Sequence, residues 1–265
     1  MRLSITHTTR YSFEAAVRYG LQQLRKTPKS SYQQKVLNWS TTIDGGHHET
    51  QFEDHHNNTV DLISFEKGTQ SLSVTCAGEI EIDDASGVLG KHRGPAPLWL
   101  YRRATPRTEA KAAANAIVRG VDGDTPLEKL HALSDAISSA ILYEVGASEP
   151  DWSAEDALAA GRGVCQDHTH VFLACARAMD IPARYVSGYL MLTDRTVQDA
   201  MHAWAEAHID GLGWVGFDIS NGISPDARYV RVATGLDYAD AAPIAGTRFG
   251  GADEALAVEI QVTQQ

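Results

Sequence analysis

The spacing of hydrophobic residues changes twice along this chain, and no other feature of the sequence limits the fold as strongly. Up to about residue 85, apolar and polar residues alternate in short runs separated by turn signals such as Asp44-Gly45-Gly46. That alternation is typical of antiparallel strands. From Thr125 to Met179 the apolar residues fall at helical spacing, and alternation returns beyond residue 180. The order of strands, helices and strands predicts an α+β fold.

The same pattern divides the chain into domains. We expect residues 1–85 to form an antiparallel β sandwich or barrel, because short strands punctuated by turns build such folds. Residues 86–106 are rich in glycine and proline, which indicates a linker. Residues 107–265 then form a second domain of helices and strands, and its last strand is expected near residues 256–262.

Composition argues against several classes of function. The 265 residues include 34 acidic and 23 basic side chains, so the basic surface that nucleic acid or an anionic membrane requires is not expected. The cysteines Cys76, Cys165 and Cys175 form no C-x-x-C pair, which argues against a disulfide framework and a cysteine zinc site. We see no apolar signal-peptide core and no run of about 18 apolar residues. A cytoplasmic protein that uses no cofactor is expected.

The most informative stretch reads Gly161-Arg162-Gly163-Val164-Cys165-Gln166-Asp167. Its glycines break the preceding helix, and the apolar residues after Cys165 have helical spacing, so Cys165 is expected at or just before a helix N-terminus. Unpaired N–H groups and the helix dipole stabilise a thiolate there, and the same N–H groups can hold an oxyanion. The alternative is a buried structural cysteine, which is the role of most lone cysteines.

A nucleophilic cysteine needs a base, and the base needs an orienting group. From His202 onward the residues alternate, which predicts a strand with His202 and Trp204 on one face and small alanines on the other. Asp210-Gly211 predicts a hairpin turn to a second strand that includes Asp218. In a hairpin centred on residue 210, His202 and Asp218 are opposed to within about one residue. Cross-strand Cβ atoms lie about 5 Å apart, so the carboxylate can reach the imidazole.

Two stretches resemble a known family: GRGVCQDHTHVFLACARAMDIPARYVSGYL and MHAWAEAHIDGLGWVGFDISNG are similar to the transglutaminase-like core of bacterial proteins. That core has a papain-like Cys–His–Asp arrangement, with helices packed on an antiparallel sheet, and the match covers roughly residues 125–235. Residues 1–85 resemble the β-rich N-terminal region that often precedes this core in bacteria. The resemblance implies that Cys165 is the nucleophile, His202 the base and Asp218 the orienting group.

The resemblance also implies roles for neighbouring residues. In family members an aromatic side chain upstream of the cysteine helps to bind the oxyanion, and Tyr143 is similar to that position; a core tyrosine at a helix end is the alternative. Asp167 and Trp204 are expected beside the three catalytic candidates. Asp167 is alternatively only a helix N-terminal charge, and Glu206 is either near the site or a solvated strand residue.

Several histidines suggest a metal site instead. His168 and His170 follow the cysteine where the family often has an aromatic and a small residue, and with the predicted base and carboxylate they could form a zinc site. Two residues apart on a helix, they point about 200° apart around its axis, which argues against that site. His47-His48 and His55-His56 flank predicted turns without carboxylate or cysteine partners at ligand spacing, so we interpret them as solvated turns rather than metal ligands.

The sequence therefore predicts an enzyme that transfers an acyl group through a thioester on Cys165, with a peptide, protein or carboxamide as its substrate. Water as the acceptor makes it a protease or amidase, which is the preferred interpretation. A lysine amine as the acceptor makes it a true transglutaminase. The pattern is also compatible with a non-catalytic binding module on the same fold and with a zinc hydrolase. The EF-hand pattern that would indicate calcium is not seen in the sequence, so no calcium dependence is inferred.

Overall fold

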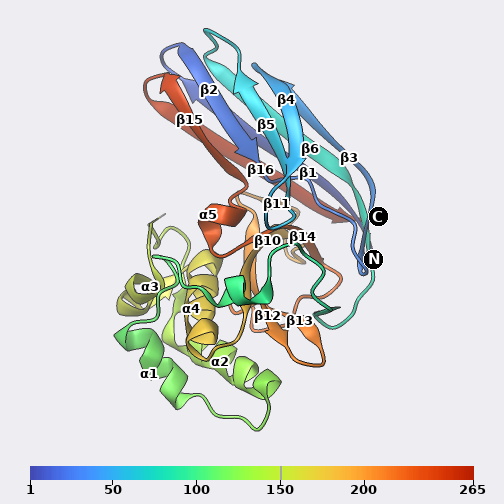
Figure 1. Ribbon diagram of the computed structural model, residues 1–265. Helices are drawn as coiled ribbons and strands as arrows, with labels where there is room; N and C mark the ends of the chain where they lie inside the picture. Colours follow the sequence, from blue (N-terminus) through green and yellow to red (C-terminus); the bar gives the residue numbers. More distant parts are fainter. Residues whose placement is uncertain (150) are drawn as a thin grey trace.

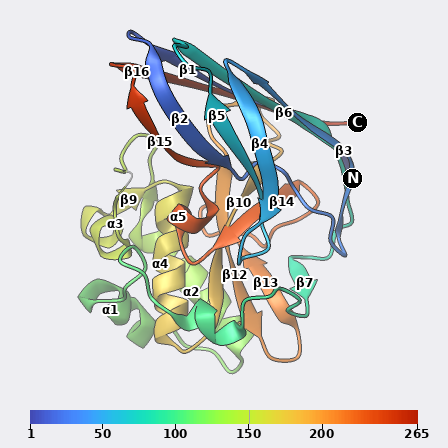
Figure 2. The same ribbon diagram turned by 45° about the horizontal axis from the view of Figure 1, so that its top comes forward.

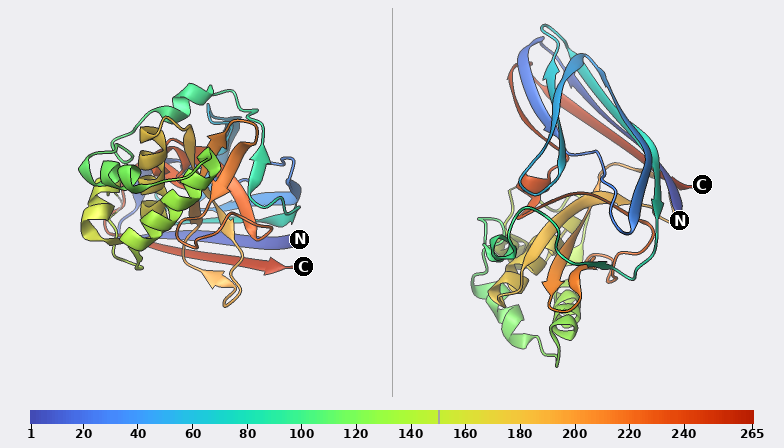
Figure 3. Two further views of the ribbon diagram at one scale, coloured as in Figure 1. Left: turned by 90° about the horizontal axis from the view of Figure 1, so that it is seen from below. Right: turned by 45° about the vertical axis from the view of Figure 1, so that its right-hand side comes forward.

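The computed structural model describes residues 1–149 and 151–265 and has the α+β fold that the sequence predicts (Figure 1). A sandwich of two antiparallel sheets lies above a part in which helices cover a third sheet. We call the first part the β sandwich and the second, which spans residues 88–243 apart from a short strand at 197–198 that joins the sandwich, the core domain. Figure 2 and the right-hand view of Figure 3 also show the two parts stacked, with the N- and C-termini on the same side.

The β sandwich contains the predicted N-terminal strands. Its first sheet has the order β11-β16-β1-β6-β3, with bounds Val197–Gln198, Glu254–Gln264, Arg2–Phe13, Ser71–Ile82 and Gln34–Asp44. Its second sheet has the order β15-β2-β5-β4, with bounds Ile244–Gly250, Val17–Leu24, Thr59–Phe65 and Gly46–Glu53. Alternate residues of β6, such as Leu72 and Val74, are buried against Val17 and Leu24 of the second sheet. Strand alternation therefore builds this core as expected.

The expected place of the C-terminal strand is wrong. We expected the strand near residues 256–262 to belong to the second domain, but β16 pairs with β1 from Phe13↔Glu254 to Leu3↔Gln264. β15 likewise pairs with β2. Alternating residues predict a strand without naming its partner, and here the partner lies at the other end of the chain. The core domain consequently ends before β15.

The core domain is built on a five-stranded sheet with the order β14-β10-β12-β13-β7. The bounds of these strands are Tyr229–Gly235, Ala183–Leu190, His202–Ile209, Gly213–Phe217 and Val88–Gly90. Helix α4 (Cys165–Ala178) covers one face, where Ala203, Ala205 and Ala207 of β12 join the same buried cluster as Val171 and Phe172. The small side chains let the helix lie close to the strand, which fixes the start of α4 relative to His202.

Other helices complete the layer on that face. They are α1 (Ala112–Gly120), α2 (Pro126–Ala140), α3 (Ala154–Ala160) and α5 (Tyr238–Ala241). The Thr125 side chain caps α2 as the sequence predicts, because its hydroxyl accepts from the N–H of Glu128. A short parallel pair, β8 (Leu142–Tyr143) with β9 (Arg162–Gly163), lies just before α4. Within the two described ranges, none of the helices has the length and apolar character to cross a membrane.

The segment interpreted as a linker is part of the core domain. β7 pairs with β13 and forms the edge of the core sheet. The following 3-10 helix η1 (Leu98–Arg102) buries the Tyr101 ring, whose centroid lies 5.3 Å from that of Trp214. Glycine and proline mark irregular backbone here, but the apolar residues between them dock on the core.

Candidate active site

Cys165 is the first residue of α4, as the glycines before it predict. Gly161 ends α3 in the left-handed conformation at φ 64°, and Gly163 lies so close to Asp167 that an added Cβ would meet its carboxylate at 2.7 Å. Asp167 in turn accepts the N–H of Val164 at 2.7 Å and so caps the helix start. The chain thus turns sharply and presents the cysteine at the positive end of a 14-residue helix.

His202 and Asp218 meet as the hairpin predicts, although the turn is centred one residue later than expected. Ala207 pairs with Val215 and Ile209 with Gly213, which centres the pairing on residue 211. The chain then bends after β13, and His202 Nε2 lies 2.6 Å from Asp218 Oδ2. Both side chains are nearly or wholly buried, so the ion pair is shielded from water.

The Asp218 carboxylate has more donors than the sequence revealed. Besides His202, the Tyr229 hydroxyl donates to Oδ2 at 2.7 Å and the Asn221 side-chain amide donates to the same atom at 2.7 Å. The Ser220 hydroxyl and the Asn221 N–H donate to Oδ1. Burial alone would raise the pKa of Asp218, but these hydrogen bonds and the charge of His202 lower it to about 2. Asp218 is therefore a fixed anion.

The His202 ring lies between this anion and Cys165. Burial would lower the pKa of His202, but the charge of Cys165 and hydrogen bonds with Asp218 and Cys165 raise it to about 10. Because Nε2 faces Asp218, the other ring nitrogen is left for the thiol. The raised pKa favours a protonated His202 ring, which places a proton donor beside Cys165.

The structure places three further predicted residues around this group. Trp204 is buried, and its ring lies nearly parallel to that of His202 with centroids 6.2 Å apart. Tyr143, on β8, is 48% exposed, and its pKa is raised first by burial and then by the charges of Cys165 and Asp218. Tyr143 thus faces the same site. Asp167 binds the helix start and the Ser148 hydroxyl instead of His202.

The histidines proposed as zinc ligands have other partners. His168 lies 2.9 Å from the carbonyl oxygen of Val164 and 3.1 Å from that of Ile141, whereas Nε2 of His170 accepts the N–H of Tyr238. The two rings therefore point into different surroundings, as their helical spacing predicts. In the part of the chain that the structure describes, no group of three His, Cys, Asp or Glu side chains could hold a metal ion.

For two other polar residues, the solvated alternative is wrong. Glu206 is not a solvated strand residue, because its carboxylate is wholly buried between Arg184, at 2.6 Å, and Arg231, at 2.9 Å. His56 is not solvated either: its ring is buried, 3.4 Å from the Tyr101 hydroxyl and 3.2 Å from the Asp240 carboxylate. Both contacts join segments that are distant in sequence, which no local pattern reveals.

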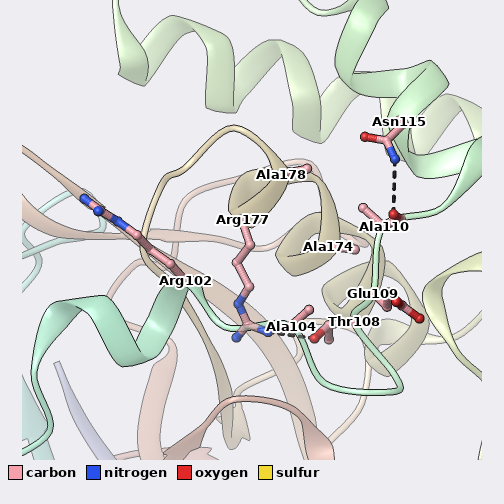
Figure 4. A pocket seen from close by; sticks show the side chains of 9 residues that line it. All are labelled: Arg102, Ala104, Thr108, Glu109, Ala110, Asn115, Ala174, Arg177 and Ala178. Carbon is pink, nitrogen blue, oxygen red and sulfur yellow. Dashed lines mark hydrogen bonds between the residues drawn. The ribbon is translucent and has the colours of Figure 1, made fainter.

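A separate hollow of about 360 Å³ lies beside the far end of α4, lined by Thr108, Asn115 and Arg177 among others (Figure 4). The buried Arg177 guanidinium donates to the Thr108 hydroxyl and to the carbonyl oxygens of Tyr101, Ala183 and Leu236. Arg177 is thus occupied in tying neighbouring segments to the helix. The hollow is not lined by Cys165 or His202.

The fold and the site define a class: an α+β protein with a papain-like arrangement of cysteine, histidine and aspartate on a helix start and a hairpin. Family comparison agrees with this class. Residues 111–219 match the transglutaminase-like superfamily core, and residues 3–81 match the bacterial transglutaminase-like N-terminal region. Residues 111–219 are therefore a transglutaminase-like core, and residues 3–81 are the N-terminal region found with it in bacteria.

Similar proteins come from several bacteria. An uncharacterized protein of Mycobacterium leprae is 27% identical and covers 99% of both chains. An uncharacterized protein of Mycobacterium bovis is 26% identical over 92% of this chain and 87% of the relative. A crystal structure from Cytophaga hutchinsonii, titled a "Putative Cysteine Protease", matches with a TM-score of 0.81 at 20% identity, over 99% of this chain and 90% of that one. The whole chain thus shares its fold with that protein.

Proposed function

We propose that this chain is a thiol-dependent enzyme that transfers an acyl group from a peptide, protein or carboxamide through a thioester on Cys165. The observation that carries the proposal is the position of the His202 ring. Its Nε2 lies 2.6 Å from Asp218, and Cys165, at the start of α4, lies close enough to raise the pKa of the same ring. The match of residues 111–219 to the transglutaminase-like superfamily supports the assignment.

In the first half of the reaction, the Cys165 thiolate attacks the substrate carbonyl carbon, and a C–S bond forms. The carbonyl oxygen becomes an oxyanion, which the N–H group of Cys165 and the Tyr143 hydroxyl stabilise. The imidazolium of His202 then gives its proton to the substrate nitrogen as the C–N bond breaks. Ammonia or an amine leaves, and the acyl group stays on the cysteine as a thioester. Asp218 keeps the ring oriented and stabilises its positive charge.

In the second half, the neutral His202 ring takes a proton from the acceptor as the acceptor attacks the thioester. With water, the C–S bond breaks to release a carboxylic acid, and the thiolate–imidazolium pair is restored. With a primary amine, the product is a new amide. We assign water as the acceptor, because water is present at tens of molar and an amine prevails only if the site binds it or excludes water. Both halves of the reaction use only these side chains, the substrate and the acceptor.

A direct experiment separates the two acceptors. The protein is incubated with a pool of glutamine-containing peptides and a labelled primary amine at millimolar concentration. Ammonia, new amino termini and incorporated label are then measured together. The leaving group is released before either acceptor attacks, so hydrolysis predicts much more ammonia, or many more new amino termini, than incorporated label. Label equal to the ammonia and new amino termini together would establish the transglutaminase alternative instead.

Matched variants show whether the products depend on the proposed site. Cys165→Ser should abolish all three signals, whereas Cys175→Ala, a change at a buried thiol outside the site, should keep them. If the wild type gives no product although Cys165 reacts readily with iodoacetamide, the proposal fails for these substrates and the binding-module alternative gains support.

A further inference from the structure

Strand β14 joins the β sandwich to the candidate active site. It is an edge strand of the core sheet, and two buried amide side chains from the sandwich side pair with its backbone. The Gln34 amide donates to the carbonyl of Arg231 at 2.9 Å and accepts its N–H at 2.8 Å. The Asn58 amide makes the same two bonds with Thr234, at 2.7 and 2.8 Å. We call these four bonds the amide clamp.

The first residue of this strand is Tyr229, whose hydroxyl donates to Asp218 Oδ2 at 2.7 Å. The Tyr229 ring packs edge-on against Trp204, with centroids 5.4 Å apart. A cavity of about 50 Å³ is also lined by Tyr229, together with Gln34 and Trp204. Packing around this residue is therefore incomplete, so the hydrogen bond of its hydroxyl and the strand that carries it contribute to its placement.

We infer that Tyr229 is a positioning residue for the proposed Cys165–His202–Asp218 group, and that the amide clamp of the β sandwich holds it in place. The inference rests on the proposed function and extends it, because it makes the N-terminal region part of the active site's support. The line of contact runs from Gln34 and Asn58 through the β14 backbone to the Tyr229 hydroxyl and then to the Asp218 carboxylate.

The Tyr229 hydroxyl should weaken the hold of Asp218 on the His202 proton. Five donors converge on the Asp218 carboxylate, which offers about four lone-pair sites. Tyr229 and Asn221 therefore compete with His202 for Oδ2. Cys165, on α4, and Arg228, beside Tyr229, are the other charged groups that act on the pair. Without the Tyr229 hydroxyl, Oδ2 should hold the imidazolium proton more tightly, and His202 should release it less readily to a leaving group.

The test is a titration of the histidine rings in the full-length protein by ¹³C NMR, with the His202 signal assigned from its loss in His202→Gln. Tyr229→Phe should raise the His202 midpoint by about half a pH unit, the effect of one neutral hydrogen bond. It should also lower kcat severalfold while leaving KM unchanged. The matched control is Tyr189→Phe, which removes another buried hydroxyl of this sheet, one that hydrogen-bonds His7 in the β sandwich. An unchanged midpoint in folded Tyr229→Phe would overturn the inference.

A second set of variants tests the amide clamp. Gln34→Met with Asn58→Ala should move the His202 midpoint in the same direction as Tyr229→Phe, and combining all three changes should add nothing further. Asn38→Ala is the control, because its exposed amide bonds only Glu79 within the β sandwich. Fully additive shifts, or no shift in the clamp variant, would disprove the link through β14.

The same measurements keep this inference separate from the proposed function. If wild-type His202 titrates near its ordinary value of 6.5 and Cys165 is no more reactive than an ordinary exposed thiol, the proposed function itself fails. If wild-type His202 titrates far above that value while Tyr229→Phe and the clamp variant match it, only the role of Tyr229 fails.

Discussion

The two parts of the molecule each bury a histidine, and the two rings carry different charges. In the β sandwich, the His7 ring hydrogen-bonds the neutral hydroxyls of Tyr189 and Thr9, and burial with the nearby Lys26 charge lowers its pKa to about 2. In the core domain, burial is outweighed by Cys165 and Asp218, and the pKa of His202 rises to about 10. Burial alone therefore does not decide the charge of a histidine; the charge of its partners does.

The contrast between His7 and His202 should change most in Asp218→Asn, which keeps the shape of the side chain and removes the anion. His202 should then lose the partner that stabilises its charge, and kcat/KM should fall roughly a thousandfold or more. The loss is measured with a glutamine-containing peptide from the pool that the wild-type protein converts. Asp210→Asn, in the exposed turn of the same hairpin, is the control and should retain activity. Activity within a few-fold of wild type would contradict the role of Asp218.

A second prediction uses the rates at which the cysteines react to test whether His202 activates Cys165. Iodoacetamide at pH 6 should label Cys165 first, because Cys76 and Cys175 are fully buried and burial raises the pKa of both thiols, that of Cys175 to about 12. His202→Ala should slow labelling of Cys165 about a hundredfold. Peptide mass spectrometry at timed intervals measures the rates. Equal labelling of all three cysteines would show that Cys165 is not activated.

The neutral state of His7 should instead be detected in the pH dependence of the free energy of unfolding. The folded pKa of His7 is far below its ordinary 6.5, so the unfolded chain binds more protons below pH 6.5 and acid favours unfolding. Over the 1.5 units from 6.5 to pH 5, this costs about 2 kcal/mol of unfolding free energy. Buried His170, with a pKa of about 3, acts in the same direction. His202 has the opposite sign: its stabilisation is full below about 6.5 and is lost as the pH rises toward 10.

Urea unfolding at pH 7.5 and pH 5 tests this difference. His7→Gln should reduce the loss between the two pH values by about 2 kcal/mol, whatever it does to the stability at pH 7.5. His47→Gln, at an exposed histidine, should leave the loss unchanged. An equal acid loss in His7→Gln and wild type would mean that His7 is not held neutral.

The smallest effect concerns the cation beside His7. Lys26 is buried, its ammonium donates to Thr9, and burial lowers its pKa to about 8. Lys26→Met should stabilise the fold by about 1 kcal/mol below pH 8, and the gain should fade between pH 8 and 10.5 as the wild-type lysine loses its charge. Thermal unfolding across this range measures it, with Lys29→Met as the control. Destabilisation by Lys26→Met at pH 7 would show that the ammonium is better satisfied than this bond suggests.

Local patterns predicted the parts of the site that depend on neighbouring residues. The glycines before Cys165 predicted the helix start, and the Asp210-Gly211 turn predicted the contact of His202 with Asp218. Tyr229 was missed, because it lies on β14, which follows β13 in the chain but pairs with β10 at the edge of the sheet. The burial of Glu206 was missed too, since its arginine partners come from two other strands. Contacts of this kind depend on sheet order, which alternation does not encode.

The predicted place of the C-terminal strand was wrong for the same reason, because β16 pairs with β1. The pairing has a consequence for how a growing chain folds. β1 leaves the ribosome long before β16, so one of its two neighbours in the sheet is made only when residues 254–264 emerge. Until then, the edge of β1 that β16 will cover has open hydrogen-bonding groups that other strands could occupy. A fragment that stops at residue 85 would keep that edge open permanently, so such fragments should aggregate more readily than the full chain.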